Sequence, residues 1–181
     1  MKLAVLLFLS VCMMGIGSHS QVDFGSKKDG QNWYIINDGV MGGLSRGNVD
    51  FKKNSLQFSG SVSLENNGGF TSFKSPFQSF DLSDYQTITI RMRNTGIELA
   101  LTLETSNRFY MPYFKHHLAA SDGEWETIKI KLTDFGQYRM GYQTGRKLTQ
   151  QELKSIIRIG FITDEKRAGN FAAEIDYILF E

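Results

Sequence analysis

One short segment of the chain has the spacing of a catalytic serine. Residues 43–47 read Gly-Leu-Ser-Arg-Gly and match the G-x-S-x-G pattern, in which a sharp turn presents a serine nucleophile. Such a turn needs a strand before it and a helix after it, and the serine needs a histidine base and an acid. Glycines precede Ser45 and a strand pattern follows it, so we interpret the segment as a glycine-rich structural turn.

Metal binding is a second chemistry that the sequence could support. His116 and His117 are adjacent, and neighbours on a strand point to opposite faces, so one ion cannot easily take both. We expect them to be exposed residues near a strand end. Several aspartates could supply oxygen ligands to calcium, although their spacing is not that of an EF-hand: Asp122, Asp134, Asp164 and Asp176. The sequence predicts no catalytic residue, no metal and no cofactor, with structural calcium as the open alternative.

Two glycine-rich turns form the most informative part of the sequence. The first follows Trp33 and contains the run N-D-G-V-M-G-G-L-S, and the second is the run E-N-N-G-G-F. Asn and Asp side chains can bond nearby backbone amides and so lock such turns. Two interpretations remain open: the turns interlock, or they build a binding surface. The candidate motif residues are Trp33, Asn37, Asp38, Met41, Gly42, Gly43, Ser45, Asn66, Gly68, Gly69 and Phe70.

Aromatic residues mark two further candidate surfaces. In an extended chain, residues 109–114 (Phe-Tyr-Met-Pro-Tyr-Phe) put one face in the core, and the other face could stack on a sugar or anchor a partner. Pro112 cannot donate to a ladder, so we predict an edge strand there. Residues 137–147 are predicted to form a recognition loop, with a merely solvated loop as the alternative. The candidate residues of this loop are Tyr138, Arg139, Tyr142 and Arg146.

Antiparallel strands must position these residues. Polar and apolar residues alternate, as in strands with one buried face, in four runs: 55–64, 87–93, 99–103 and 128–132. Residues 156–163 and 171–180 are apolar on both faces and are predicted to be central strands. A capping box formed by Thr149 and Glu152 predicts one short helix near 150–155. The expected fold is all-β, a two-sheet antiparallel β-sandwich or jelly roll.

The first twenty residues are predicted to be a signal peptide. A positive charge precedes an almost unbroken apolar run over residues 3–16, which is shorter than the roughly 20 residues of a spanning helix. Small residues before Gln21 predict cleavage after Ser20, which leaves a single domain over residues 21–181. We expect this domain to be exported to the periplasm or the exterior. Cys12, the only cysteine, leaves with the signal peptide, so no disulfide is expected.

The composition excludes two classes of protein. Lys and Arg number 20 and Asp and Glu number 19, so the chain lacks the excess of positive charge of a strongly basic nucleic-acid-binding protein. Hydrophobic residues make up 41% of the chain, which is ordinary for a globular protein and excludes wholesale disorder. The sequence therefore indicates a folded domain without a nucleic-acid partner.

The double glycine-rich motif resembles a known family. The runs W…NDGVMGG-S and F-G-S-V-S-L-ENNGGF-S are similar to those of the complex I intermediate-associated protein family, and the similarity continues at Asp122–Trp125, Ile159–Phe161 and Asp164–Phe171. The resemblance implies a galactose-binding-like β-sandwich. It also implies a non-catalytic binding chaperone that assists assembly of NADH:ubiquinone oxidoreductase. The family motif carries no established catalytic residue.

The expected function follows from the family resemblance and the predicted signal peptide together. Mitochondrial members of the family work on the matrix side, which corresponds to the bacterial cytoplasm, whereas this chain is predicted to be exported. We expect an exported form of the assembly module that binds proteins, with respiratory membrane subunits among its partners. The alternative is a carbohydrate-binding module of the cell envelope, with glycans as its ligands. The sequence leaves membrane association undecided.

Overall fold

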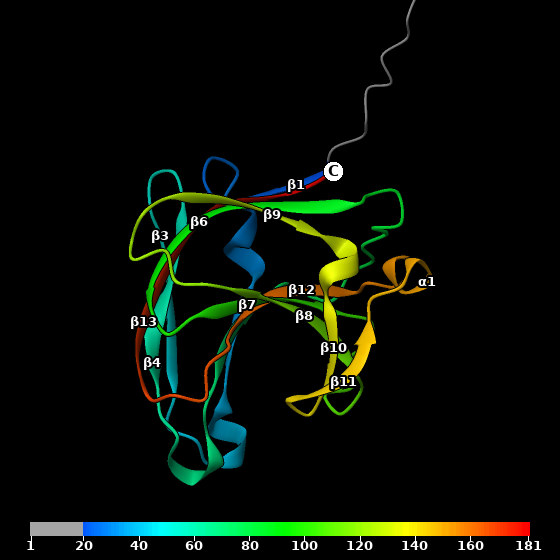
Figure 1. Ribbon diagram of the computed structural model, residues 1–181. Helices are drawn as coiled ribbons and strands as arrows, with labels where there is room; N and C mark the ends of the chain where they lie inside the picture. Colours follow the sequence, from blue (N-terminus) through cyan, green and yellow to red (C-terminus); the bar gives the residue numbers. More distant parts are fainter. Residues whose placement is uncertain (1–19) are drawn as a thin grey trace, which may run out of the picture.

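The computed structural model describes residues 20–181 as two antiparallel sheets that share one hydrophobic core (Figure 1). The six-stranded sheet contains β1 (Ser20–Asp23), β3 (Arg46–Phe51), β4 (Leu56–Val62), β6 (Thr87–Gly96), β9 (Glu126–Lys131) and β13 (Gly169–Phe180). The seven-stranded sheet contains β2 (Tyr34–Asn37), β5 (Thr71–Lys74), β7 (Leu99–Glu104), β8 (Tyr113–Leu118), β10 (Gly136–Arg139), β11 (Tyr142–Lys147) and β12 (Arg158–Thr163). The helical elements are α1 (Gln150–Leu153) and the 3-10 turns η1 (Asp29–Asn32), η2 (Asp38–Met41), η3 (Glu65–Asn67) and η4 (Leu132–Asp134). The predicted two-sheet sandwich is confirmed, whereas the predicted signal peptide, with Cys12, lies outside the described residues except for Ser20.

The two sheets are each built around a strand from the last third of the chain. The order is β3-β4-β13-β6-β9 in the six-stranded sheet, with β1 also paired to β13. The order is β11-β10-β8-β7-β12-β5-β2 in the seven-stranded sheet. Strand β13 pairs antiparallel with β4 on one side and β6 on the other, and β12 pairs in the same way with β5 and β7. The prediction that these two apolar runs form central strands is confirmed.

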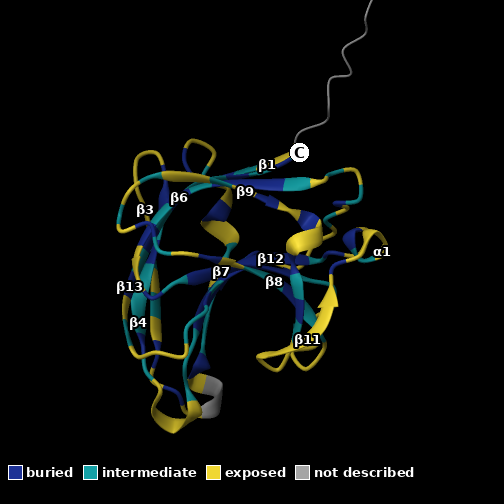
Figure 2. Cartoon of the chain, viewed as in Figure 1, coloured by how far each residue is buried: buried dark blue, intermediate teal, exposed yellow. Residues whose placement is uncertain are grey.

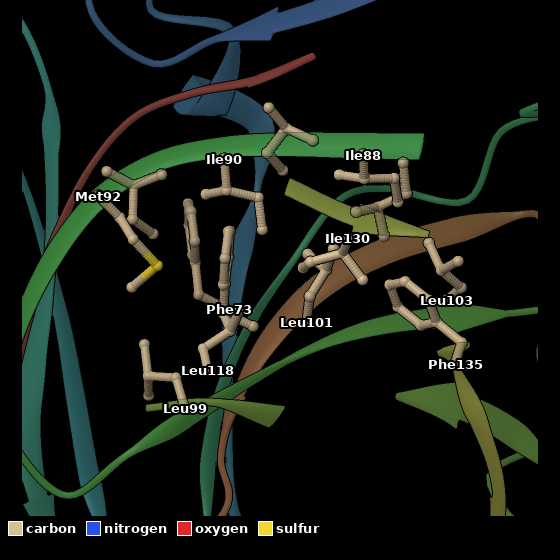
Figure 3. Close-up of a cluster of buried hydrophobic side chains, with 14 of the residues drawn as sticks. Phe73, Ile88, Ile90, Met92, Leu99, Leu101, Leu103, Leu118, Ile130 and Phe135 are labelled. Carbon is tan, nitrogen blue, oxygen red and sulfur yellow. The ribbon is translucent and has the colours of Figure 1, made fainter. Parts of the chain in front are cut away.

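The core lies between the inner faces of the sheets (Figure 3). Alternate residues of the internal strands point inward, as the period-two pattern predicts. Ile88 and Ile90 of β6 and Leu101 of β7 are fully buried, and Figure 2 shows buried residues concentrated along the paired strands. Phe58 of β4 and Phe73 of β5 also enter this core, so both sheets contribute aromatic rings to it.

The predicted helix is present as α1. The Thr149 side chain accepts from the Glu152 backbone N–H at 3.4 Å, and the Glu152 carboxylate accepts from the Thr149 backbone N–H at 2.9 Å. Leu153 is buried and fixes this short helix against the sandwich. No helix within residues 20–181 is long and apolar enough to cross a membrane.

Two sequence-based predictions about local structure are wrong. Residues 137–147 do not form a loop, because most of them belong to the β10–β11 hairpin at one end of the seven-stranded sheet. Every residue of β11 is exposed, so the strand lacks the alternation that would have revealed it. The predicted edge strand at Pro112 is also wrong: β8 begins one residue later, at Tyr113, and lies between β7 and β10.

The seven-stranded sheet is strongly curved. Figure 1 shows β10 and β11 bending away from the plane of β7, β8 and β12, on the side opposite the core. We call this side the outer face of the seven-stranded sheet. On this side, the ring of Tyr138 of β10 lies beside Tyr113 and Lys115 of β8.

Candidate functional site

The carboxylate of Asp38 lies at the centre of the two glycine-rich turns. The residue is only 2% exposed, and its side chain accepts four hydrogen bonds. Ser45 supplies its backbone N–H at 3.1 Å and its hydroxyl at 2.5 Å. Gly69 and Phe70 supply backbone N–H groups at 2.7 and 3.2 Å. One carboxylate therefore joins the turn that follows η2 to the turn that precedes β5.

Two asparagines extend this connection. The side-chain oxygen of Asn37 accepts from the Gly47 backbone N–H at 3.1 Å and from the Thr71 hydroxyl at 2.6 Å. The side-chain amide of Asn66 donates to the Gly42 carbonyl at 3.0 Å. The structure thus brings the predicted Asn, Asp and Gly residues of the two motifs together, and the geometry favours the interpretation that the turns interlock.

Two glycines leave the space that the Asp38 carboxylate occupies. A Cβ atom on Gly43 would lie 2.3 Å from Cγ of Asp38, and a Cβ atom on Gly68 would lie 2.7 Å from its Oδ2. Real Cβ atoms essentially never come this close to another heavy atom. A side chain at either position would therefore push the carboxylate away from its donors.

Hydrogen bonding keeps Asp38 charged despite its burial. Burial alone would raise the pKa of Asp38, but the hydrogen bonds from Ser45, Gly69 and Phe70 outweigh it and hold the pKa below its ordinary value of 3.8. The negative charge is therefore present at neutral pH and is directed at internal donors. In this position the carboxylate is a structural group of the turns.

The solvent-facing part of these turns carries polar side chains, glycines and two leucines. Gly42 and Asn66 are exposed, and Leu44 and Leu64 are 45% and 46% exposed. Trp33, the first candidate residue of the motif, lies elsewhere. Its ring packs against the core rings of Phe24 and Phe73, with centroid separations of 5.1 and 5.2 Å. The side chain of Met41 lies outside the described part of the chain.

The outer face of the seven-stranded sheet carries a second group of polar residues. Because Leu101 and Leu103 of β7 point into the core, Thr102 and Glu104 point outward. The strand register places outward residues of the neighbouring strands beside them. This face carries Tyr34, Lys74, Thr102, Glu104, Tyr113, Lys115, His117, Tyr138 and Arg158.

Arg158 is the most buried charge on this face. Its side chain is 9% exposed, and its guanidinium carbon lies 3.4 Å from the ring centroid of Phe77 and 5.3 Å from that of Tyr34. One terminal nitrogen approaches Glu104 at 3.4 Å, and the other donates to the Tyr34 hydroxyl. Glu104 also pairs with Lys74 at 2.5 Å. Within residues 20–181, the buried Nε of Arg158 has no hydrogen-bond partner.

A second charged network lies across the same face. Lys115 of β8 pairs with Asp164, at the end of β12, and lies over the ring of Tyr138 at 4.2 Å from its centroid. His117 lies between two carboxylates, with Nε2 at 2.7 Å from Glu98 and Nδ1 at 3.2 Å from Asp164. These pairs hold β8, β10 and the end of β12 together, so they fix the positions of the outward side chains.

The two aromatic segments that the sequence singled out are neighbours at one end of this face. The rings of Tyr113 and Tyr138 lie 6.2 Å apart, and Nε of Arg139 donates to the Tyr110 carbonyl at 3.2 Å. Burial, and next the negative charge of Asp164, raise the pKa of Tyr113 to about 12. Tyr113 is therefore a neutral hydroxyl at any physiological pH and can both donate and accept a hydrogen bond.

The second pair of residues predicted for the recognition loop lies on β11, at the edge of the sheet. Tyr142 is 72% exposed, and Arg146 pairs with Glu152 at 3.4 Å. The ring of Tyr142 also lies 5.5 Å from Nζ of Lys166, in the turn that follows β12. The structure thus places all four candidate residues of the segment on one hairpin, with Tyr138 facing the charged network and Tyr142 facing solvent.

The described residues do not form a serine-histidine-acid arrangement around Ser45. This serine is fully buried, and its hydroxyl donates to Asp38. His116 and His117 point to opposite faces, as predicted, since His116 packs 5.6 Å from the core ring of Phe135. The expectation that both are exposed is wrong for His116, which is half-buried because β8 is an internal strand, and this burial lowers its pKa.

The aspartates proposed as oxygen ligands are dispersed. Within residues 20–181, no group of three or more His, Cys, Asp or Glu side chains is arranged to hold a metal ion. Asp164 faces Lys115, and Asp176 pairs with Arg91 at 2.6 Å. The negative charge of these two residues is therefore balanced by protein cations.

The group formed by Tyr34, Lys74 and Arg158, toward the β2 edge of the outer face, was not among the residues singled out from the sequence. These residues lie on β2, β5 and β12, and only the strand pairing brings them together. One signal was present: Arg158 interrupts the otherwise apolar run 156–163. A charge in a central strand needs a partner on a neighbouring strand, and Glu104 is that partner.

The fold is a β-sandwich similar to that of carbohydrate-binding modules. A family 11 carbohydrate-binding module of cellulase Lic26A-Cel5E from Clostridium thermocellum superposes with a TM-score of 0.65 at 17% identity, over 89% of this chain and 94% of that one. The family 11 module from the same organism in complex with a β-1,3-1,4-mixed-linked tetrasaccharide gives a TM-score of 0.62 at 17% identity, over 90% and 94%. An exo-β-agarase gives 0.58 at 13% identity, over 91% of this chain but 25% of that one. At these identities the likeness shows the fold.

The chain belongs to the complex I intermediate-associated protein 30 (CIA30) family, whose model matches residues 22–175. The match spans both glycine-rich turns and nearly the whole sandwich. The resemblance stated from the sequence is therefore confirmed. Among curated protein sequences, none matches this chain.

Proposed function

We propose that this protein is a non-catalytic binding module that assists the assembly of a respiratory membrane complex, in an exported form. Its membership of the complex I intermediate-associated protein 30 family supports the assembly role. The predicted signal peptide supports export, which would place the protein in the periplasm or outside the cell. In this proposal the protein acts by holding partners, and no bond is made or broken.

The observation that carries this proposal is the outer face of the seven-stranded sheet. Arg158 and Tyr34 lie together toward its β2 edge, and arginine and tyrosine are enriched among the residues that dominate protein interfaces. The ion pairs of Lys74 and Lys115 fix the surrounding side chains before any partner arrives. A surface that is already ordered loses less conformational entropy on binding.

A saccharide is the second candidate ligand, and the same face supports it. The rings of Tyr113 and Tyr138 lie near charged groups, and a sugar offers an apolar C–H face to aromatic rings and hydroxyls to polar groups. The structural neighbour with a bound tetrasaccharide has the same type of sandwich. This candidate predicts weak binding of a soluble oligosaccharide on the outer face.

Crosslinking in the native cells separates the two candidates. A tagged copy is crosslinked, captured and analysed by mass spectrometry, beside a variant with Tyr138→Ser on the outer face. The matched control is Tyr177→Ser, because Tyr177 is also half-buried but lies on β13 of the other sheet. Respiratory subunits captured by the parent and the control, but lost with Tyr138→Ser, would support the assembly role.

A glycan array tests the second candidate with the same three proteins. Oligosaccharide binding that is lost only with Tyr138→Ser would support a carbohydrate-binding module. If neither respiratory subunits nor glycans depend on Tyr138, the outer face is not the recognition surface. Thermal unfolding of each variant confirms that lost binding does not come from lost folding.

A further inference from the structure

The most exposed apolar side chains of the described chain gather beside one end of the outer face of the seven-stranded sheet. Phe109, Tyr142 and Met140 are 84%, 72% and 57% exposed, more than any other large hydrophobic side chain that the structure describes. They lie on two segments, residues 105–112 between β7 and β8 and residues 139–147 of the β10–β11 hairpin. We call these two segments the aromatic tip.

The two segments of the aromatic tip are held side by side. Nε of Arg139 in the hairpin donates to the carbonyl of Tyr110 in the β7–β8 connection at 3.2 Å. The Met111 backbone N–H donates to the Arg108 carbonyl at 3.0 Å, which closes a turn and presents Phe109 at its end. Figure 1 shows the β7–β8 connection and the β10–β11 turn next to each other at the same end of the molecule.

The charge of the aromatic tip differs from that of the rest of the chain. The two segments contain no Asp or Glu and four cations, Arg108, Arg139, Arg146 and Lys147, in a chain that has 20 positive and 19 negative residues overall. Of these four, Arg146 forms the one ion pair within residues 20–181, at 3.4 Å from Glu152. Lys166 adds a further positive charge over the ring of Tyr142.

This combination has a specific physical meaning. Large apolar side chains that are exposed together, rather than scattered singly, mark an interaction site. Tyrosine favours the headgroup level of a bilayer, phenylalanine and methionine favour its apolar boundary, and Lys and Arg favour anionic headgroups. A protein partner of matching charge would need acidic groups around an apolar pocket, whereas an anionic bilayer offers negative charge above apolar chains everywhere. We therefore propose that the aromatic tip docks the protein on the surface of an anionic lipid bilayer.

The docking is peripheral and reversible in this proposal. Phe109 and Met140 enter the boundary between headgroups and acyl chains, while Arg108 and Lys147 stay among the lipid phosphates. The outer face of the seven-stranded sheet lies next to the tip, since Tyr113 directly follows the β7–β8 connection. A partner bound on that face would be held beside the membrane. The proposal does not depend on which partner binds there.

Vesicle cosedimentation tests this inference. The full chain is mixed with vesicles of phosphatidylcholine alone or with about one third phosphatidylglycerol, at low and high salt, where screening weakens headgroup attraction. We expect binding to the anionic vesicles, weakened by salt, and little binding to the neutral ones. The double variant Arg108→Ser/Lys147→Ser lacks two cations of the tip. Each cation near a membrane contributes about fivefold in affinity, so this variant should bind anionic vesicles about 25-fold more weakly.

The apolar contribution is tested with a matched pair of phenylalanines. Phe109→Ser should lower the affinity for anionic vesicles at least tenfold, whereas Phe51→Ser should not change it, because Phe51 is also exposed but lies on β3 of the other sheet. All variants carry the same residues 1–19, so any difference in their vesicle binding comes from the substituted residue. Their thermal unfolding should match that of the parent.

Three results would overturn the proposal. The parent does not bind anionic vesicles, or Phe109→Ser and Phe51→Ser bind equally, or the charge variant keeps full affinity. The protein could also bind native membranes and lose that binding when the membranes are treated with protease. That result would assign the tip to a protein receptor instead. None of these results decides the crosslinking experiment, so the two proposals fail separately.

Discussion

Replacing Asp38 by alanine is the sharpest test of the turn architecture. The substitution leaves three backbone N–H groups and the Ser45 hydroxyl without their acceptor. A buried donor without a partner costs about 1–3 kcal/mol, and losses within one network do not add fully. We therefore expect the free energy of unfolding to fall by about 4 kcal/mol. For a domain of this size that corresponds to a loss of about 12 °C in Tm.

Urea unfolding followed by circular dichroism measures this change. The control is Asp50→Ala, because the carboxylate of Asp50 is 55% exposed and pairs with the exposed Lys52. An exposed pair contributes little, so this variant should stay within about 0.5 kcal/mol of the parent. If Asp38→Ala lost less than about 1 kcal/mol while partner capture disappeared, Asp38 would belong to a binding surface and our assignment of a structural role would be refuted.

Three further results are expected. Gly43→Ala should destabilise the fold by about 2 kcal/mol or more, since its Cβ would meet Asp38 at 2.3 Å, whereas Gly39→Ala, whose Cβ meets nothing within 4 Å, should be close to neutral in the same urea assay. The folded pKa of Asp38 is below 3.8, so its stabilisation is fully present above that value and is lost as the pH falls through the folded pKa. Asp38→Ala should therefore lose less stability than the parent on acidification, and an equal acid loss in both proteins would contradict this linkage. In an ultraviolet absorbance titration of the folded protein, Tyr113 should ionise only at about pH 12, and Tyr113→Phe should remove that step.

The sequence was most informative where local pattern and local contact coincide. Period-two alternation predicted β4, β6 and β9, because each has one buried and one more exposed face. It also predicted β7, although β7 is buried on both faces except at Glu104. The interlocking of the turns through Asp38 could also be predicted as one of two interpretations, since Asn and Asp side chains commonly bond the amides of glycine-rich turns. The capping box of α1 involves residues three apart and needs no tertiary information.

The rest depends on strand pairing, which one sequence does not reveal. Tyr34 and Arg158 meet only because β2 and β12 both pair with β5. The β10–β11 hairpin was missed because β11 is exposed on both faces and shows no alternation. The error at Pro112 has a simple cause: proline is excluded from an internal ladder, but it is acceptable one residue before the ladder begins.

The position of β12 and β13 has a consequence for the order in which the protein folds. Each of these strands has neighbours on both sides that come earlier in the chain, so neither sheet is continuous until residues 158–180 are available. During synthesis, β4 and β6 cannot be joined into one sheet until β13 is available to pair with both. In the same way, β5 and β7 cannot be joined until β12 is available. Pairings that span so much sequence form slowly. The nascent chain therefore stays open until its last strands emerge, and only then can both halves of the sandwich close.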